Sequence, residues 1–222
     1  MDNTPQFFIQ KDKNEISGRD QIASHTLQYY EDHAEEFAAN TINADMEAMR
    51  GRFLAYLPEG ARIMDFGCGT GRDAKAFCDL GYEVAALDGS EALCRIACDL
   101  TGLPVRCMDF SSYSPAQGEQ YDGIWACASL LHLKKNELPP VMHSLGRALN
   151  VGGIFYVSFK YGDFEGERNG RYFSDFTLEG FREFMKLLPE FREVEHWITG
   201  DVRPGRGDER WLNMILEKIG GL

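Results

Sequence analysis

The chain has 222 residues, and its 23 Lys and Arg against 35 Asp and Glu give a net charge of −12 at pH 7. This length suits one large domain, or one domain with a small cap. The hydrophobic share of 44% and charged share of 26% are those of an ordinary globular protein, and they exclude disordered, collagen-like and membrane-spanning chains. The acidic balance argues against a protein whose main task is to grip phosphate backbones, so no nucleic-acid partner is expected.

The cysteines and the N-terminus bear on the cellular compartment. The six cysteines are Cys68, Cys78, Cys94, Cys98, Cys107 and Cys127. None has C-x-x-C spacing and no His cluster accompanies them, which predicts a reducing compartment and no metal site. Residues 1–15 lack the pattern of a signal peptide, and no apolar run approaches the roughly 18 residues of a membrane span. We therefore expect a cytoplasmic protein without a membrane partner; the sequence does not predict its oligomeric state.

Residues 1–60 are predicted to form a helical cover of two amphipathic helices. Pro58 and Gly60 end the second helix. Apolar residues recur at mostly three- and four-residue steps, first at Ile22, Leu27, Tyr30, Ala34 and Phe37, then at Met46, Met49, Phe53 and Leu57.

From residue 61 to residue 222, short apolar runs alternate with helical stretches. The predicted strands are 62–66, 83–87, 104–108, 121–127, 153–159, 191–199 and 210–218, and the predicted helices are 72–80, 90–100, 137–149 and 177–188, with Ser90 as an N-cap. This alternation predicts an α/β, Rossmann-like, doubly wound sheet of seven mostly parallel strands with helices on both faces. The last two strands, joined by residues 200–207, form an antiparallel C-terminal hairpin. Cover and sheet are expected to form one structural unit.

A glycine-rich loop follows the first strand as Asp65-Phe66-Gly67-Cys68-Gly69-Thr70-Gly71-Arg72. Such a loop lets a ligand approach the bare backbone, and the helix after it favours negative groups. The dinucleotide fingerprint G-x-G-x-x-G would need glycine where Arg72 stands. A carboxylate at Asp65 would also repel a pyrophosphate, whereas it suits the ammonium group of S-adenosylmethionine, which has no phosphate.

Two further strands end in carboxylates. Asp88 follows the first glycine by 21 residues, where a carboxylate can accept both ribose hydroxyls of either nucleoside ligand. Asp109 can accept from an adenine amine, with Met108 and Phe110 against the ring. A single strand-end Asp is as often a turn or cap residue. Three in consecutive units on one sheet edge favour a common ligand.

These motifs resemble the class I S-adenosylmethionine-dependent methyltransferases. The resemblance rests on Asp65-x-Gly67-x-Gly69-x-Gly71, Asp88, Asp109, the stretch 121–126 leading to Leu131-His132, and Gly152-Gly153. Residues 158–162 and 170–173 look most like small-molecule and tellurite-resistance-type methyltransferases. The resemblance implies S-adenosylmethionine as cofactor and S-adenosylhomocysteine as product. The cofactor-binding residues that we predict are Asp65, Gly67, Cys68, Gly69, Gly71, Arg72, Asp88, Gly89, Ser90, Met108, Asp109, Phe110, Ala126, Cys127, Ala128, Leu131, Tyr29 and Tyr30.

Methyl transfer needs mainly alignment, exclusion of water and sometimes removal of a proton. His132 lies at a strand end on the ligand side and has the intrinsic pKa range of a base, so it is the candidate catalytic residue. A histidine that satisfies a loop carbonyl or caps a helix is an equal interpretation. Either Tyr29 or Tyr30 is expected to close over the methionine end of the cofactor, the alternative being two core aromatics.

Basic residues near two rim loops suggest an anionic or electron-rich small substrate. The predicted substrate-binding residues are Lys160, Arg171, Tyr172 and Arg203, with Arg168 and Arg206 close by. Six acids lie in or beside these loops, so solvated turns of mixed charge are the competing interpretation.

The sequence favours a methyltransferase for a small molecule. Methylation of a protein or tRNA is the alternative, while the absence of an N-P-P-Y-type tetrapeptide disfavours a DNA-base methylase. A nicotinamide-dependent oxidoreductase and a non-catalytic cofactor-binding module are further alternatives.

Overall fold

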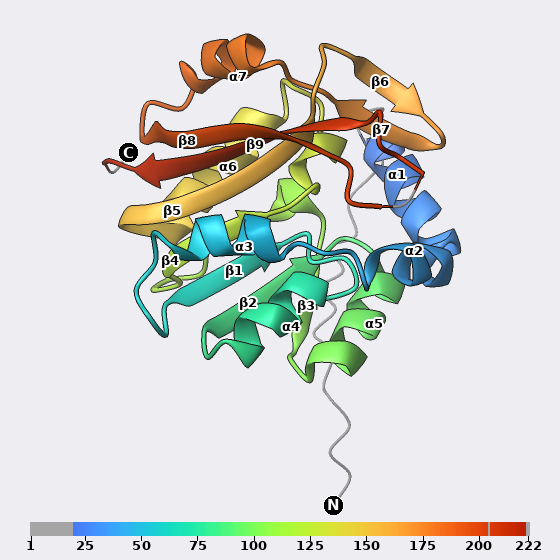
Figure 1. Cartoon of the computed structure of the whole chain (residues 1–222), viewed down its shortest axis with the longest axis horizontal. Helices are drawn as coiled ribbons and strands as arrows, with labels where there is room; N and C mark the ends of the chain where they lie inside the picture. The colour runs from blue at the N-terminus through green and yellow to red at the C-terminus, as the bar shows by residue number, and fades with distance from the viewer. Residues whose placement is uncertain (1–19, 204, 221–222) are drawn as a thin grey trace, which may run out of the picture.

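The computed structural model describes residues 20–203 and 205–220, with side chains from residue 25 onward (Figure 1). The predictions for residues 1–15 and for the Ile22 side chain lie outside this part. The helices are α1 Asp20–Asp32, α2 Ala34–Thr41, α3 Glu47–Leu54, α4 Arg72–Asp79, α5 Glu91–Thr101, η1 Phe110–Ser112, η2 Leu130–His132, α6 Leu138–Ala148 and α7 Leu178–Met185. The strands are β1 Arg62–Phe66, β2 Glu83–Asp88, β3 Val105–Cys107, β4 Tyr121–Ala126, β5 Leu149–Lys160, β6 Glu165–Arg168, β7 Arg171–Ser174, β8 Phe191–Gly200 and β9 Arg210–Lys218.

Seven strands form one sheet in the order β3-β2-β1-β4-β5-β9-β8. The first five pair in parallel, and β9 runs antiparallel to both β5 and β8. This confirms the predicted doubly wound sheet with its C-terminal hairpin. Figure 1 shows α1 and α2 at one end of the sheet and the C-terminus at the other. Among the described residues, no helix is long and apolar enough to cross a membrane.

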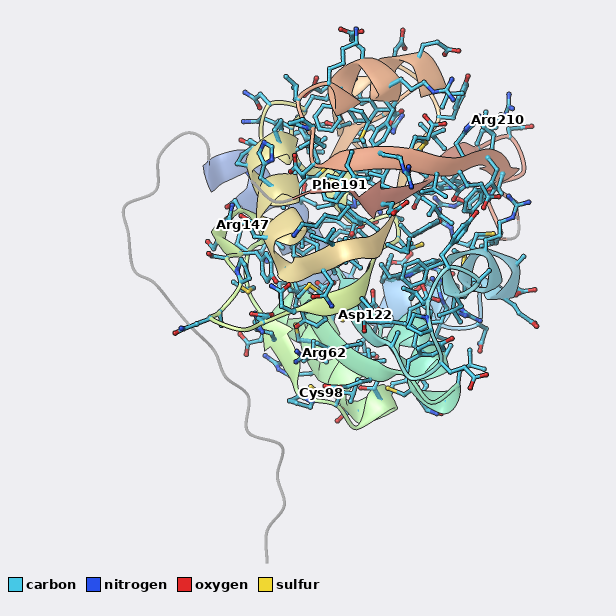
Figure 2. The ribbon with its side chains drawn as sticks, turned by 90° about the vertical axis from the view of Figure 1, so that its left-hand side faces the viewer. Arg62, Cys98, Asp122, Arg147, Phe191 and Arg210 are labelled. Carbon is cyan, nitrogen blue, oxygen red and sulfur yellow. The ribbon has the colours of Figure 1, made fainter. Side chains whose placement is uncertain are left out.

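The two faces of the sheet bury alternate residues of each strand, as the period of a β-strand requires. Trp125 and Tyr156 point to one face, where their rings stack at 3.9 Å and pack with Phe53 of α3 and Phe77 of α4. Their chain neighbours point to the other face, into the large cluster beneath α6 and α7. Side chains fill both layers (Figure 2).

The amino end of the sheet is closed by hydrogen bonds to one carboxylate. Asp122 accepts from the backbone N–H of Arg62 at 2.9 Å and from Asn150 Nδ2 at 2.9 Å. Figure 2 shows Arg62 and Asp122 close together. Asp122 thus has a structural role at the amino end of the strands. A ligand is expected at the opposite, carboxyl end of the sheet.

Two local predictions are corrected. The first predicted helix is two helices, because the chain breaks at His33, whose φ of −121° is not helical. Residues 161–175, predicted as one of the two rim loops, contain the antiparallel hairpin β6–β7. Asn169 and Gly170 turn this hairpin with φ angles of +53° and +74°, the geometry that Asn-Gly favours.

Candidate active site

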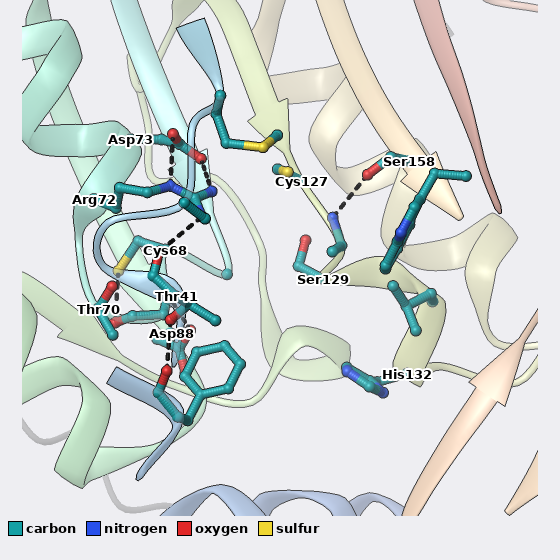
Figure 3. A pocket seen from close by; sticks show the side chains of 18 of the residues that line it. Thr41, Cys68, Thr70, Arg72, Asp73, Asp88, Cys127, Ser129, His132 and Ser158 are labelled. Atoms are coloured by element: carbon teal, nitrogen blue, oxygen red, sulfur yellow. Dashed lines mark hydrogen bonds and ion pairs between the residues drawn. The ribbon is translucent and has the colours of Figure 1, made fainter. Parts of the chain in front are cut away.

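A cavity lies at the carboxyl end of the parallel strands. It is bounded on one side by the residues that follow β1, β2 and β4, and on the other by α1, α2 and the start of α3. The loop between β8 and β9 closes its rim. Figure 3 shows Asp88 and the Arg72–Asp73 pair on one side, and Ser129, Ser158 and His132 across from them. The cavity thus lies at the carboxyl ends of the strands, where a ligand was expected.

The glycine loop makes the sharp turn from β1 into α4. Gly67 has a φ of +80°, and a Cβ there would lie 2.3 Å from the Cβ of Ser129. The backbone N–H groups of Gly67 and Cys68 both donate to the carbonyl of Leu87 at 2.9 Å. The loop is therefore fixed to the end of β2, and only a residue without a side chain fits at position 67.

Asp65 lies at the carboxyl half of β1 and lines the cavity. It is 2% exposed, and its Oδ2 has no hydrogen-bond partner among the described residues. Burial, and then the nearby Asp73, raise the pKa of Asp65 well above its usual value. Leaving a buried acceptor unpaired costs about 1–3 kcal/mol, and more for a charged group. A cationic donor placed at Asp65 would offset this cost.

Asp88 ends β2 and is held by two backbone groups. Its Oδ2 accepts from the N–H of Gly69 at 2.8 Å, and its Oδ1 accepts from the N–H of Ser90 at 2.9 Å. Burial raises the pKa of Asp88, although these hydrogen bonds oppose the shift. A carboxylate has about four acceptor sites, so two remain for hydroxyls of a ligand.

Asp109 has the capping role that was one of its two interpretations. Its Oδ1 accepts from the N–H of Ser111 at 2.7 Å and from the Ser111 hydroxyl, which starts the short helix η1. Asp109 and Phe110 nevertheless line the cavity. The cap orients the carboxylate and leaves Oδ2 without a hydrogen bond among the described residues.

A buried carboxylate that sequence reasoning missed, Asp73, joins the glycine loop to the cover. It accepts from Arg50 at 2.7 Å, from Arg72 at 2.6 Å and from the indole N–H of Trp125 at 3.1 Å. Arg72 also donates to the carbonyl of Thr41 at 3.2 Å (Figure 3). Although burial alone would raise it, these partners lower the pKa of Asp73. The only signal in the sequence was an acid in the first turn of a helix.

His132 and Tyr30 both line the cavity and are in direct contact. The Nδ1 of His132 lies 2.7 Å from the carbonyl of Tyr172, so this nitrogen carries the proton. The Nε2 is then an acceptor, and it receives the Tyr30 hydroxyl at 2.8 Å. Burial lowers the pKa of His132 to about 4, and burial likewise raises the pKa of Tyr30. Both groups are therefore neutral at pH 7.

The basic residues predicted at the rim divide between cavity and surface. Lys160, Arg171, Arg203 and Arg206 line the cavity. Arg168 does not, because its guanidinium pairs with Asp175 at 2.6 Å. Tyr172 is also outside the lining: its hydroxyl donates to Glu165 at 3.1 Å, which points it away from the cavity. The prediction of Tyr172 as a substrate-binding residue is therefore not supported.

Most predicted cofactor-binding residues line the cavity. They are Asp65, Gly67, Cys68, Gly69, Arg72, Asp88, Gly89, Asp109, Phe110, Cys127, Ala128, Leu131 and Tyr30.

Five others do not line it, and each has a structural role. Tyr29 stacks on His33 at 4.4 Å, and the Ser90 hydroxyl caps α5 by accepting from the N–H of Leu93. Gly71 precedes α4, where a Cβ would lie 3.0 Å from the Cβ of Ala97. Met108 and Ala126 pack into the large core cluster. Strand-end position in the sequence did not distinguish these residues from the lining.

Sequence reasoning also missed two serines that line the cavity. The Ser129 hydroxyl donates to the carbonyl of Phe66 at 2.6 Å. The Ser158 hydroxyl accepts from the N–H of Ala128 at 2.9 Å, and Ala128 has a left-handed φ of +52°. These bonds hold the turn after β4 in a sparsely populated conformation, which is common at functional sites. Their positions near strand ends were the available signal.

Comparison with known proteins agrees with this geometry. Residues 63–153 match the family model described as a methyltransferase domain. Magnesium-protoporphyrin O-methyltransferase of Rhodobacter capsulatus is 32% identical over 129 residues, which are 54% of this chain and 56% of that protein. The chain spans about half the length of the curated relatives it matches.

Solved structures share the fold. The 1,6-didemethyltoxoflavin-N1-methyltransferase of Burkholderia thailandensis, with 1,6-didemethyltoxoflavin and S-adenosylhomocysteine bound, has a TM-score of 0.71 at 19% identity and covers 94% of each chain. The [4+2]-cyclase SpnF has a TM-score of 0.63 at 17% identity, over 87% of this chain and 95% of its own. The chain thus shares its fold with these structures, one of which is a methyltransferase with S-adenosylhomocysteine bound. More particularly, residues 63–153 are similar to a methyltransferase domain, and the closeness to the tellurite-resistance type stays a prediction.

Proposed function

We propose that this protein transfers the methyl group of S-adenosylmethionine to a small molecule and releases S-adenosylhomocysteine. The proposal rests on Asp65, a buried carboxylate that lines the cavity and has one oxygen without a hydrogen bond from the residues that the structure describes. The cofactor has an ammonium group that would supply the missing donor. A dinucleotide would instead bring a pyrophosphate to this carboxylate.

The residues of the cavity fit the remaining parts of the cofactor. Asp88 has acceptor capacity for the ribose hydroxyls, and Asp109 with Phe110 offers an acceptor and a ring for the adenine. The turn at Cys127-Ala128-Ser129 would lie along the sulfonium. When bound, S-adenosylmethionine supplies an activated methyl group.

The chain itself would align the acceptor, exclude water and hold a proton. The cover contributes Tyr30 and Phe37 to the cavity lining, so cover and sheet together would shield the reacting atoms. His132 is the candidate base, and its Nε2 is engaged by the Tyr30 hydroxyl. A proton from the acceptor would thus pass to the Tyr30 oxygen as Tyr30 gives its own proton to His132.

A small acceptor is favoured over a protein or tRNA. Residues of α1, α2 and α3 line the cavity opposite the strand ends, and a small acceptor fits between cover and sheet more readily than a macromolecule does. The methyltransferase from B. thailandensis described above also binds a small molecule. Because a cyclase shares this fold, turnover has to be measured and not only binding.

The test is calorimetric titration of the purified chain with S-adenosylmethionine and, separately, with NAD⁺. We expect binding of the first alone. Asp65→Asn should weaken it roughly 10- to 100-fold, since hydrogen bonds to charged groups contribute about 1.5–3 kcal/mol. Asp79→Asn on the exposed side of α4 is the matched control and should change nothing. Binding of NAD⁺ alone would overturn the proposal.

The second part of the proposal is methyl transfer to a small molecule. It is tested by measuring the release of S-adenosylhomocysteine in the presence of a collection of small metabolites. We expect turnover with at least one small-molecule acceptor and no turnover with a mixture of peptides or of tRNA. Cofactor binding without turnover on any acceptor would identify a binding module instead.

A further inference from the structure

Five basic side chains line the cavity, and four of them are already neutralised. Arg72 pairs with Asp73 at 2.6 Å, and Arg203 pairs with Asp201. Lys160 and Arg206 both pair with Glu209. A cation that is paired with a carboxylate has little left for an anionic ligand, so these four do not select for one.

Arg171 differs from the other four. It forms no ion pair with any carboxylate of residues 25–203 and 205–220. Its Nη1 donates to the Tyr30 hydroxyl at 3.4 Å, a long bond to a neutral group, and its buried Nε has no hydrogen-bond partner in the described part of the chain. Arg171 as a whole is half-buried, and its charge is not compensated by a carboxylate of the described residues.

The surroundings of Arg171 are aromatic. Its guanidinium carbon lies 4.5 Å from the ring centre of Tyr29, 5.3 Å from that of Phe173 and 5.7 Å from that of Tyr30. Cation–π contacts of this kind orient a guanidinium but leave its charge in place. Phe173 and Tyr30 also line the cavity, so an apolar body beside the charge would meet apolar surface.

Arg171 lies on the acceptor half of the cavity. It is joined through Tyr30 to His132, and Figure 3 shows His132 across the cavity from Asp88 and Cys68. The proposed cofactor would occupy the acidic half of the cavity, which contains Asp65 and Asp88. The basic half, which contains Lys160, Arg171 and Arg203, would be left for the acceptor.

We propose that the methyl acceptor carries a carboxylate, and that Arg171 binds it. This inference rests on the proposed function, because it takes the acidic side to be filled by the cofactor. The planar fork of a guanidinium matches a carboxylate with two parallel hydrogen bonds. The acceptor class is therefore a small carboxylic acid with an apolar, flat body.

Two other roles for Arg171 are less consistent with these contacts. As a counter-charge for a Tyr30 phenolate it would need to lower the pKa of Tyr30, but burial outweighs Arg171 and raises that pKa. As a purely structural link between α1 and β7 it is not needed, since Thr26 already accepts from the N–H of Tyr172 at 3.0 Å.

The experiment compares benzoate with benzamide, which has the same shape without the charge. Each is titrated into the protein saturated with S-adenosylhomocysteine, and cofactor affinity is measured separately for every variant. We expect benzoate to bind at least tenfold more tightly than benzamide. Arg171→Gln should lose that preference, Arg171→Lys should keep part of it, and Arg206→Gln, the paired control, should change benzoate affinity less than twofold.

The outcomes separate this inference from the proposed function. Normal S-adenosylhomocysteine binding with no benzoate preference, or with a preference that Arg171→Gln leaves intact, overturns the carboxylate site alone. Absence of any cofactor binding overturns the proposed function. Thermal unfolding of each variant shows whether it folds, and if Arg171→Gln does not, Arg171→Lys decides: unchanged benzoate affinity and unchanged Tm together would contradict bidentate binding.

Discussion

The acidic and the basic halves of the cavity are built on opposite principles. In the acidic half, Asp65 and Asp88 are buried side by side with little compensating charge, and their pKa values are raised by burial. In the basic half, Lys160 and Arg203 each have a carboxylate partner, and Arg171 alone of the lining cations has none among the described residues. In the acidic half, Asp65 and Asp88 thus have no salt bridge among the described residues, although Asp73 beside them is paired with arginines; the basic half cancels most of its own charge.

This difference teaches how the two halves can recognise ligands. Unpaired carboxylates in a dry site favour one cationic ligand strongly and destabilise the empty protein. Paired cations shape a rim and contribute little selectivity. The number of charged residues near a site is therefore a poor guide to the charge of its ligand. What decides the selectivity is whether those residues are already paired.

The largest expected effect comes from breaking the anchor of the acidic half. Asp73→Asn leaves Arg50 and Arg72 without their buried carboxylate, and it weakens the link from the glycine loop to α2 and α3. Removing one partner of a buried ion pair costs roughly 3 kcal/mol. Urea unfolding should show a lower midpoint with an unchanged slope.

The control for this prediction is Asp79→Asn, on the same helix. Asp79 pairs with Lys75 in the open, at 60% and 41% side-chain exposure, so the change should cost less than about 0.5 kcal/mol. Equal midpoints for the two variants would contradict the anchoring role of Asp73.

A smaller effect concerns His132 in the basic half. Burial, with help from the charges of Arg171, Lys160 and Arg168, lowers the pKa of His132 from 6.5 to about 4. Between these values the unfolded chain takes up a proton that the folded protein does not, so stability falls as the pH drops from 6.5 to 4. The loss from this group should be on the order of 1–3 kcal/mol.

Unfolding free energies measured at pH 6.5, 5.5 and 4.5 check this sign. His132→Gln should flatten the decline, whereas the exposed His25→Gln should leave it unchanged. A decline that is equally steep in all three proteins would show that other groups cause it.

The smallest expected effect comes from releasing a second cation in the basic half. Asp201→Asn removes the charged partner of Arg203, whose backbone N–H and Nε donate to Asp201 Oδ1 at 2.9 and 2.8 Å. Asparagine keeps an acceptor for Arg203 but removes the charge that neutralises it, so benzoate affinity should rise roughly two- to fivefold. Calorimetry measures the benzoate affinity of this variant. A lower affinity than that of the unchanged protein would mean that Asp201 orients Arg203 toward the ligand.

Much of the acidic half could be predicted because each residue there is defined by its place after a strand. Asp65, Asp88 and Asp109 follow runs of apolar residues, and parallel strands bring their carboxyl ends to one edge. The same reasoning placed Ser90 and Met108 in the site, where the structure gives them a capping role and a core position. Strand-end position indicates an edge, while the direction of a side chain depends on the next turn.

The hairpin β6–β7 shows a signal that was present and not used. Asn169-Gly170 between short runs is a strong hairpin pattern, and recognising it would have separated Arg171 on β7 from Arg168 on β6. The sequence could still not predict which of the two arginines lacks an ion pair, because the partner of Arg168 is Asp175, five residues beyond the turn.

The sequence by itself determined the sheet, its glycine loop and the carboxylates at its edge, because apolar periodicity and strand ends are local properties. Only the tertiary structure decided which charges are paired. Asp73 meets Arg50 across 23 residues of chain, and Tyr30 meets His132 across 102. Ion pairs and hydrogen bonds form over a few ångströms between distant segments, and a pattern of residue types does not encode those distances.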